Sequence, residues 1–133
     1  MRDLPALREM GRRFHDAARP EWPWSDEGFD TTIRQVMGAG FLALTERGFL
    51  AGLIAPQPLN PAWRVAHELL WWSEDRKGLD LIRAFRRWAE AQGASEIKWS
   101  CRAGNERVTR VYARIAAPSE IYFSEILPCV SAQ

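Results

Sequence analysis

The clearest pattern of apolar and polar positions lies mid-chain, where a strand-like segment precedes a polar break and a helical period. Residues 64–72 are rich in branched and aromatic side chains that suit a buried strand. Apolar residues then recur at three- and four-residue spacing over 79–89, with arginines on the other face and Gly93 where a helix should stop. The pattern predicts a strand, a loop at 73–78 and a helix that ends near Gln92.

The loop between this strand and this helix has the features of an anion site. Arg76, Lys77 and Gly78 stand directly before the helix. The first N–H groups of a helix have no partner within it, and the helix dipole is positive at this end. A phosphate group at the loop would therefore meet backbone donors and positive side chains together.

Helical and strand-like periods alternate through the rest of the chain as well. Ser25 has the position of an N-cap, and three prolines make 55–62 a predicted loop. Because a helix separates strands 64–72 and 96–100, a right-handed crossover should make them parallel. The other predicted elements are a helix over 4–18, a helix from 26 to about 38, antiparallel strands over 41–46 and 49–54, a helix over 105–115, and one or two strands within 121–127.

Composition narrows the class of protein. A length of 133 residues suits one domain, 1–133, and a hydrophobic fraction of 47% can fill a core. The net charge of +1 offers no field for nucleic acid or an anionic membrane, so neither is expected as a partner. No apolar run approaches the roughly 20 residues that cross a bilayer, and the charged N-terminus is unlike a secretory signal, so we expect a cytoplasmic protein. Cys101 and Cys129 lack metal-ligand spacing, and no metal is expected.

Three polar side chains in these elements are candidates for chemistry. Glu68 lies mid-strand, where a carboxylate is unusual unless it faces an opening or a partner, which makes it the candidate general base. His67 should point to the opposite face with Leu69 and Trp71, as a hydrogen-bonded core histidine. Cys101 has no histidine beside it in sequence, which argues against a nucleophilic thiol.

The order of elements resembles that of the GNAT superfamily of acyl-CoA-dependent N-acetyltransferases, starting after the first strand of that family. Two motifs within about 41–127 carry the resemblance. Asn105-Glu-Arg-Val-Thr-Arg-Val-Tyr112 is similar to the family's Asn-x-x-Ala-x-x-Leu-Tyr segment, and Asp75-Arg-Lys-Gly-Leu-Asp80 is similar to its Arg/Gln-x-x-Gly-x-Gly/Ala loop. The resemblance implies an α/β fold of the mixed α+β type: a central mixed sheet with splayed parallel strands and helices on both faces.

The sequence also departs from the family pattern. Asp75 stands in place of the cation of the loop motif and Asp80 in place of its small residue, so that only Gly78 matches in register. Carboxylates there would repel a pyrophosphate. Ala116-Ala117 replaces the Gly-Phe that usually follows the tyrosine, and the chain begins directly in the first predicted helix. Short variants of this kind resemble those encoded by phages and prophages.

The resemblance implies transfer of an acetyl group from acetyl-CoA to a primary amine of a small molecule or peptide. It makes Tyr112 the general acid for the leaving thiolate, beside Glu68 as the base. A backbone N–H of the central strand would polarise the thioester carbonyl. The implied coenzyme A site comprises the strand end, the loop and one helix residue: Leu70, Trp71, Trp72, Arg76, Lys77, Gly78, Leu79, Asp80 and Asn105.

Two other classes of function compete with this one. A GNAT-like module that has lost coenzyme A binding is favoured by Asp75 and Asp80. If Trp22 and Trp24 are exposed, they form an aromatic patch, which would also favour this class and would indicate binding to a protein partner or to a second copy in a homodimer. A nucleic-acid-binding role ranks third, because basic residues are interleaved with acidic ones. In the non-catalytic classes Tyr112 is a core residue with a satisfied hydroxyl.

Overall fold

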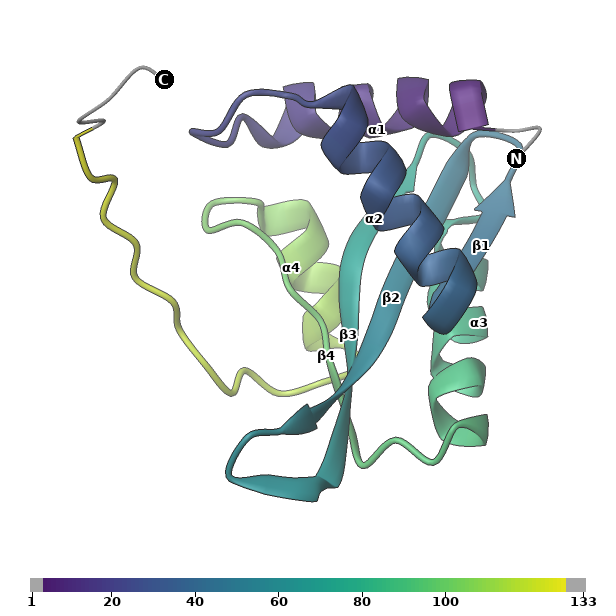
Figure 1. Ribbon diagram of the computed structural model, residues 1–133, viewed down its shortest axis with the longest axis vertical. Coiled ribbons are helices and arrows are strands. Elements are labelled where there is room, and N and C mark those ends of the chain that lie inside the picture. The colour runs from purple at the N-terminus through teal and green to yellow at the C-terminus, as the bar shows by residue number, and fades with distance from the viewer. Residues whose placement is uncertain (1–3, 129–133) are drawn as a thin grey trace.

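The structure is a computed structural model that describes residues 4–128 (Figure 1). Its elements are α1 (Leu4–Ala18), α2 (Asp26–Ala39), β1 (Phe41–Thr45), β2 (Gly48–Gln57), β3 (Asn60–Ser73), α3 (Gly78–Ala91), β4 (Glu96–Lys98) and α4 (Glu106–Ala113). The strands form one sheet in the order β1-β2-β3-β4. β1, β2 and β3 are antiparallel neighbours, and β4 is parallel to β3. The predicted mixed α/β sheet with a parallel crossover pair is confirmed.

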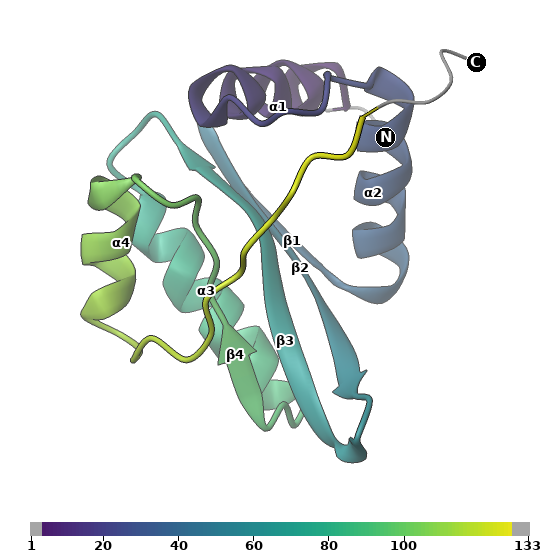
Figure 2. The ribbon, with the colours of Figure 1, turned by 90° about the vertical axis from the view of Figure 1, so that its left-hand side faces the viewer.

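Helices cover both faces of the sheet, as predicted (Figure 2). On one face α3 and α4 pack through Phe85 and Tyr112 against Leu50 and Ala66 of the strands. On the other face α1 and α2 pack against the side chain of Phe49 and its neighbours. The sheet is thus the middle layer of three, with an apolar core on each side.

The helix ends follow local sequence signals. Ser25 is the predicted N-cap of α2, and its Oγ accepts the N–H of Gly28 at 3.0 Å. Asn105 caps α4 in the same way, with Oδ1 accepting the N–H of Val108 at 3.1 Å. The helix predicted over 105–115 is therefore shorter, because Asn105 stands outside it as the cap.

The predicted loop at 55–62 is wrong, because β2 and β3 continue through it as a hairpin. β2 runs to Gln57 and β3 starts at Asn60. Proline lacks an N–H and is normally confined to strand edges. Pro56 lies beyond Gly52, the last β2 residue that pairs with β1, and Pro61 precedes the segment of β3 that pairs with β4. Both prolines therefore stand where their strand has one neighbour.

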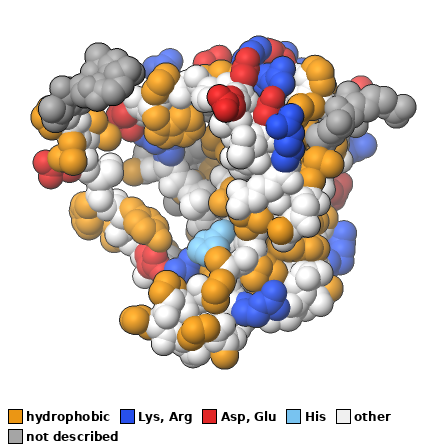
Figure 3. Space-filling model, viewed as in Figure 1, with side chains coloured by type: hydrophobic (Ala, Val, Ile, Leu, Met, Phe, Trp, Pro, Cys, Tyr) orange, Lys and Arg blue, Asp and Glu red, His pale blue; other side chains and the backbone are white. Residues whose placement is uncertain are grey.

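The predicted strands within 121–127 are also wrong. Residues 114–128 contain no helix or strand. Glu120 still pairs with Lys98 of β4, and after it the segment leaves the body of the molecule (Figure 1). A hollow separates this outer part from the body in the space-filling view (Figure 3). The side chains of Tyr122 and Phe123 are 82% and 92% exposed. Branched and aromatic residues favour a strand only where a neighbouring strand supplies hydrogen bonds, and no described strand lies beside this segment.

β3 carries a bulge that changes which side chains share a face. Ala51 pairs with Leu70, but Gly52 pairs with Glu68, so Leu69 is the extra residue. A one-residue shift moves the following side chains to the opposite face. Trp71 consequently packs with the core on the α3 side, while Trp72 packs with the core on the α1 side. The prediction that Trp71 shares a face with His67 is wrong for this reason.

β3 and β4 diverge just before the bulge. The last parallel pair is His67 with Lys98, and β4 ends there rather than at Ser100 as predicted. Beyond this pair the edge of β3 that faces β4 has no ladder partner among the described strands. The splayed pair of parallel strands expected from the sequence is therefore present.

Gly52 is expected to be essential for stability because a side chain there has no room. A Cβ at Gly52 would lie 2.3 Å from Cε1 of Phe85 and 2.8 Å from the carbonyl oxygen of His67. We expect Gly52→Ala to lower the free energy of unfolding by about 1–3 kcal/mol, as for an overpacked core. The control is a helical glycine, Gly38, where an added Cβ would meet no neighbouring atom within 4 Å. Gly38→Ala should be neutral or stabilising by about 1 kcal/mol. Urea denaturation measures the free energy of unfolding of both variants, and an equal decrease in the two would contradict the packing argument.

Candidate active site

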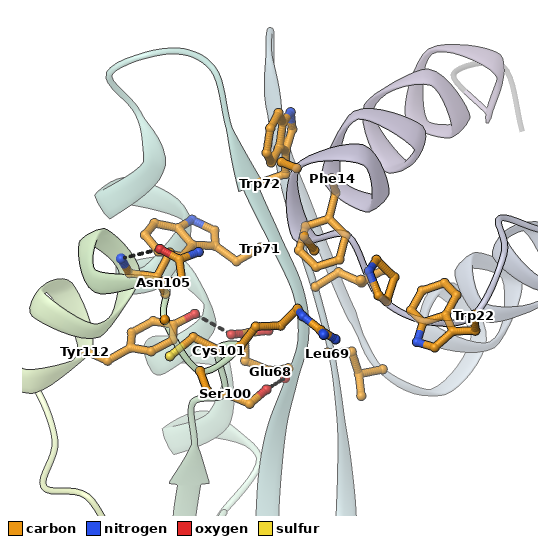
Figure 4. Close-up of a pocket in the computed structure, with 18 residues that line it drawn as sticks. Phe14, Trp22, Glu68, Leu69, Trp71, Trp72, Ser100, Cys101, Asn105 and Tyr112 are labelled. Atoms are coloured by element: carbon orange, nitrogen blue, oxygen red, sulfur yellow. Dashed lines mark hydrogen bonds between the residues drawn. The ribbon is translucent and has the colours of Figure 1, made fainter. Parts of the chain in front are cut away.

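A cavity of about 720 Å³ opens where β3 and β4 diverge (Figure 4). β3 forms its floor, α4 and the loop before it form one wall, and the end of α1 with the following loop forms the other. Its volume is in the range of ligand pockets. The cavity is lined by Phe14, Ala17, Ala18, Pro20, Trp22, Glu68, Leu69, Leu70, Trp71, Trp72, Ser100, Cys101, Arg102, Ala103, Gly104, Asn105, Val108 and Tyr112.

The two residues predicted for proton transfer meet in this cavity. The hydroxyl of Tyr112 on α4 donates a hydrogen bond to Oε1 of Glu68 on β3. Glu68 is 5% exposed and Tyr112 is 8% exposed. The rings of Trp71 and Trp99 lie 5.6 and 5.5 Å from that of Tyr112, between centroids, and hold it in place. The sequence marked each residue separately but gave no sign of the hydrogen bond between them.

Burial changes the proton affinity of both groups. It raises the pKa of Glu68 from 4.5 to about 7, although hydrogen bonds from Tyr112 and the backbone of Ser100 favour the charged form. The pKa of Tyr112 is also raised, first by burial and then by the charge of Glu68. A carboxyl group with a pKa near 7 can accept and release a proton at neutral pH. The pair is therefore suited to acid–base chemistry.

Asn105 positions the wall that carries Tyr112. As the N-cap of α4 it fixes the start of the helix, and its side chain also lines the cavity. Leu70, Trp71 and Trp72 line the floor. Because of the bulge, Trp71 lies toward α4 and Trp72 toward α1. Of the predicted cofactor residues, these four surround the cavity.

The other five predicted cofactor residues, Arg76, Lys77, Gly78, Leu79 and Asp80, lie at the N-terminus of α3, outside the cavity lining. The cap position of α3 is Lys77, whose side chain makes no capping hydrogen bond. Trp71 connects the loop with the cavity, because its Nε1–H donates to the carbonyl oxygen of Gly78 at 3.2 Å. The side chain of Trp71 therefore lies between the cavity and the first residue of α3.

The carboxylate of Asp75 is engaged with neighbouring loops. It accepts hydrogen bonds from the Thr45 hydroxyl at 2.8 Å, from the N–H of Lys77 at 3.0 Å and from the N–H of Arg47 at 3.1 Å. These hydrogen bonds, that of Thr45 first, lower the pKa of Asp75 to about 2. Asp75 therefore ties the 73–78 loop to the turn between β1 and β2. Asp80 forms an exposed ion pair with Arg83 at 3.2 Å.

Several cavity residues were not predicted as site residues. Phe14 belongs to the helical period of α1 and carries no local signal of a site, and the sequence indicates Trp22 only as part of an aromatic patch for a protein partner. Leu69 lines the cavity because it is the bulged residue of β3. Cys101 also lines it, with Sγ 3.4 Å from the hydroxyl of Thr109. His67 is on the face of β3 opposite Glu68 as predicted and lies outside the lining, but it is only half-buried, so the prediction of a core histidine is wrong.

The chain resembles solved structures of acetyltransferases. Ribosomal-protein-alanine N-acetyltransferase from Brucella melitensis biovar Abortus 2308 is 16% identical, with a TM-score of 0.67 over 96% of this chain and 94% of that chain. An aminoglycoside N-acetyltransferase in complex with CoA is 17% identical, with a TM-score of 0.71 over 96% and 90%. An acetyltransferase from Trypanosoma brucei is 13% identical, with a TM-score of 0.65 over 94% and 93%.

No family model matches the sequence, and no curated protein matches it at a significant level. The structural likenesses nevertheless cover nearly the whole chain. They confirm the GNAT fold that the order of elements predicted. Within residues 4–128, no helix is long and apolar enough to cross a membrane.

The raised pKa of Glu68 predicts a pH-dependent stability. The folded state holds the proton more tightly than the unfolded state, so ionisation of Glu68 opposes folding. Stability should be highest below pH 4.5 with respect to this group, fall as pH rises to about 7, and stay reduced above that. The full difference is on the order of 3 kcal/mol. Glu68→Gln, which keeps an acceptor for Tyr112, should therefore gain stability relative to wild type across this window.

Urea denaturation between pH 4 and pH 8 measures this difference. Glu46→Gln is the control, because Glu46 is exposed on the turn after β1. A difference between wild type and Glu68→Gln that stays constant over the whole pH range would show that Glu68 titrates normally.

Proposed function

We propose that this protein is an N-acetyltransferase that transfers an acetyl group from acetyl-CoA to a primary amine. The observation that carries the proposal is the buried Glu68–Tyr112 hydrogen bond, which lies where the parallel strands of a GNAT fold diverge. The fold alone does not fix an activity. The pair adds two proton-exchanging groups in contact with a cavity large enough for substrates.

The residues at the N-terminus of α3 fit the pyrophosphate of coenzyme A. Lys77 leaves the helix start without a side-chain cap, and neither Arg76 nor Lys77 forms an ion pair with a described residue. A Cβ at Gly78 would lie 3.1 Å from Ser73 and 3.3 Å from Trp71, so the loop is packed closely around this glycine. Asp75 stays ionised, because its hydrogen bonds lower its pKa to about 2, so its repulsion of the pyrophosphate has to be offset by Arg76, Lys77 and the helix dipole.

The unpaired edge of β3 fits the remainder of the cofactor. Beyond His67 the strand has no ladder partner on the β4 side among the described strands, and the contact there is from the Ser100 hydroxyl to the carbonyl oxygen of Glu68, so the backbone groups near 70–72 are free of ladder bonds. An extended ligand can bind such an edge as an added strand would. A backbone N–H at this edge is also placed to polarise a carbonyl oxygen.

Glu68 and Tyr112 would act together in proton transfer. Acetyl-CoA supplies the acetyl group, whose carbonyl carbon exchanges its bond to sulfur for a bond to the amine nitrogen. Glu68 accepts the proton that the amine loses, since its pKa is about 7. Tyr112 gives its hydroxyl proton to the sulfur. Because the raised pKa of Tyr112 makes a lasting tyrosinate costly, the protonated Glu68 returns a proton to it through their hydrogen bond.

The second candidate is a GNAT-like module without catalysis. The observation that favours it is the pair of aspartates, Asp75 and Asp80, in the loop before α3 and its first turn. Thermal unfolding with added acetyl-CoA separates the two functions, because a ligand of the native state raises its melting temperature by mass action. No shift with acetyl-CoA and no acetyl transfer by the wild-type protein would favour the module.

Tyr112→Phe is the test of the acid–base pair. The ring keeps its contacts with the tryptophans, but the proton donor is lost, so turnover should fall by about 10²–10⁴-fold. The melting-temperature shift caused by acetyl-CoA should remain. Tyr122→Phe is the matched control, because Tyr122 is an exposed tyrosine outside the cavity that also bonds a glutamate, Glu120. Release of free thiol from acetyl-CoA in the presence of a panel of amines measures turnover.

Unchanged turnover in a folded Tyr112→Phe protein would remove Tyr112 from the mechanism. The substitution also leaves the carboxylate of Glu68 with one donor fewer, which should cost about 1–3 kcal/mol of stability. Circular dichroism therefore has to show that the variant is folded at the assay temperature.

Lys77→Glu tests the anion site. Reversing the charge at the N-terminus of α3 should weaken binding of acetyl-CoA by about tenfold or more, because the helix dipole and the side chain favour the pyrophosphate together. Arg87→Glu makes the same change on the exposed surface of α3, more than two turns away, and should leave affinity nearly unchanged. Isothermal titration calorimetry measures the affinity of both variants for acetyl-CoA. If both lose the same affinity, the pyrophosphate binds elsewhere.

A further inference from the structure

The cavity has two walls of different chemistry. The wall on the α4 side carries Tyr112 and Asn105, and it adjoins the loop that leads to α3. The opposite wall is formed by the end of α1 and the following loop, where Phe14 and Trp22 lie across β3 from Tyr112 (Figure 4). Since the cofactor would occupy the side of α3 and α4, the second wall is left for the acceptor.

This second wall is apolar and aromatic. Its residues are Phe14, Ala17, Ala18, Pro20, Trp22 and the bulged Leu69. Leu69 is 39% exposed and Trp22 is 56% exposed, so neither side chain is buried in the core. Exposed apolar side chains that line a cavity indicate a surface for an apolar ligand.

The aromatic rings of this wall are held in position. Nε2 of His15 lies 2.9 Å from the carbonyl oxygen of Trp22, and the two rings are 5.0 Å apart between centroids. Phe14 makes an edge-to-face contact with Trp72 at 6.4 Å between centroids. A ligand ring would therefore meet side chains that need little further ordering on binding.

The charges that line the cavity disfavour a polycationic acceptor. Among the described lining residues, only Glu68 and Arg102 carry a charge. Arg102 forms an ion pair with Glu21 at 3.5 Å, and Glu68 is engaged with Tyr112. A substrate with several ammonium groups needs several carboxylates to replace the water that it loses. One buried carboxylate suits a ligand with one amine.

We propose that the acceptor is a primary amine attached to an apolar aromatic group, with its ring between Phe14, Trp22 and Leu69 and its amine directed to Glu68. This inference rests on the proposed acetyl transfer and names the substrate class for the same cavity. The transfer is the one described above: the amine nitrogen gains the acetyl carbon, its proton passes to Glu68, and the sulfur is protonated through Tyr112. The aromatic group supplies binding energy away from the reacting atoms.

An amine panel tests the proposal. Phenethylamine and tryptamine are compared with spermidine and kanamycin, using thiol release from acetyl-CoA as the assay. The aromatic amines should have kcat/KM values about tenfold or more above those of the polycations. Equal values, or higher values for spermidine or kanamycin, would overturn the proposal.

Substitution of the aromatic wall supplies a second test. Trp22→Ala should reduce kcat/KM for phenethylamine about tenfold, mostly through KM, and leave ethylamine nearly unaffected. Trp63→Ala is the matched control, because Trp63 is a partly exposed tryptophan of β3 outside the cavity lining. Equal losses on phenethylamine and ethylamine would show that Trp22 does not contact the acceptor ring.

The proposed acetyl transfer and the proposed acceptor class can be contradicted by different results. If acetyl-CoA raises the melting temperature and is slowly hydrolysed, but no aromatic amine is preferred, the acceptor class is wrong while the transferase stands. Calorimetric titration of phenethylamine and spermidine without acetyl-CoA reports on the aromatic wall alone. If wild type binds phenethylamine more tightly than spermidine and Trp22→Ala loses this preference, the aromatic wall is the acceptor site. If wild type shows no such preference, the proposed acceptor site is wrong.

Discussion

The one-residue bulge at Leu69 is the constraint on which the candidate site depends. Before it, Glu68 points toward α4; after it, Trp71 points the same way, which strict alternation would forbid. Opposite the bulge stands Gly52, whose missing side chain lets the ring of Phe85 lie against the backbone of β2. Sheet register, the packing of α3 and the surroundings of Tyr112 are thus fixed at one place in the sheet.

Burial of the Glu68 carboxyl group lowers the stability of the fold. A carboxylate removed from water is expensive unless it is protonated or well paired, and the described residues around it supply a tyrosine hydroxyl and a backbone group but no cation. Replacement by an apolar residue would suit stability better. A group that opposes folding at neutral pH, lines a cavity and exchanges protons near pH 7 is what acid–base catalysis requires. Because Tyr112 donates a hydrogen bond to Glu68, the titration of the two groups is coupled and belongs to the pair and not to either residue.

Sequence predicted the features that are determined locally. The helix over 4–18, the cap at Ser25 and the parallel pair of β3 and β4 follow from apolar spacing, side-chain capping and the handedness of a crossover. Features that depend on distant neighbours were missed. The prolines of 55–62 are compatible with strands only because β1 and β4 are too short to reach them. Residues 121–127 have the composition of a strand, but no strand within residues 4–128 lies beside them.

The same distinction separates the two walls of the cavity. Asn105 and Tyr112 lie seven residues apart on one helix, so a spacing in the sequence can identify them. Phe14, Trp22 and Leu69 come together only through the packing of α1 on β3 and through the bulge. Proteins of this fold include enzymes that act on a ribosomal protein and on aminoglycosides, so the fold does not determine the acceptor. Acceptor chemistry has to be inferred from the wall that tertiary packing assembles, and in this chain that wall is aromatic and almost without charge.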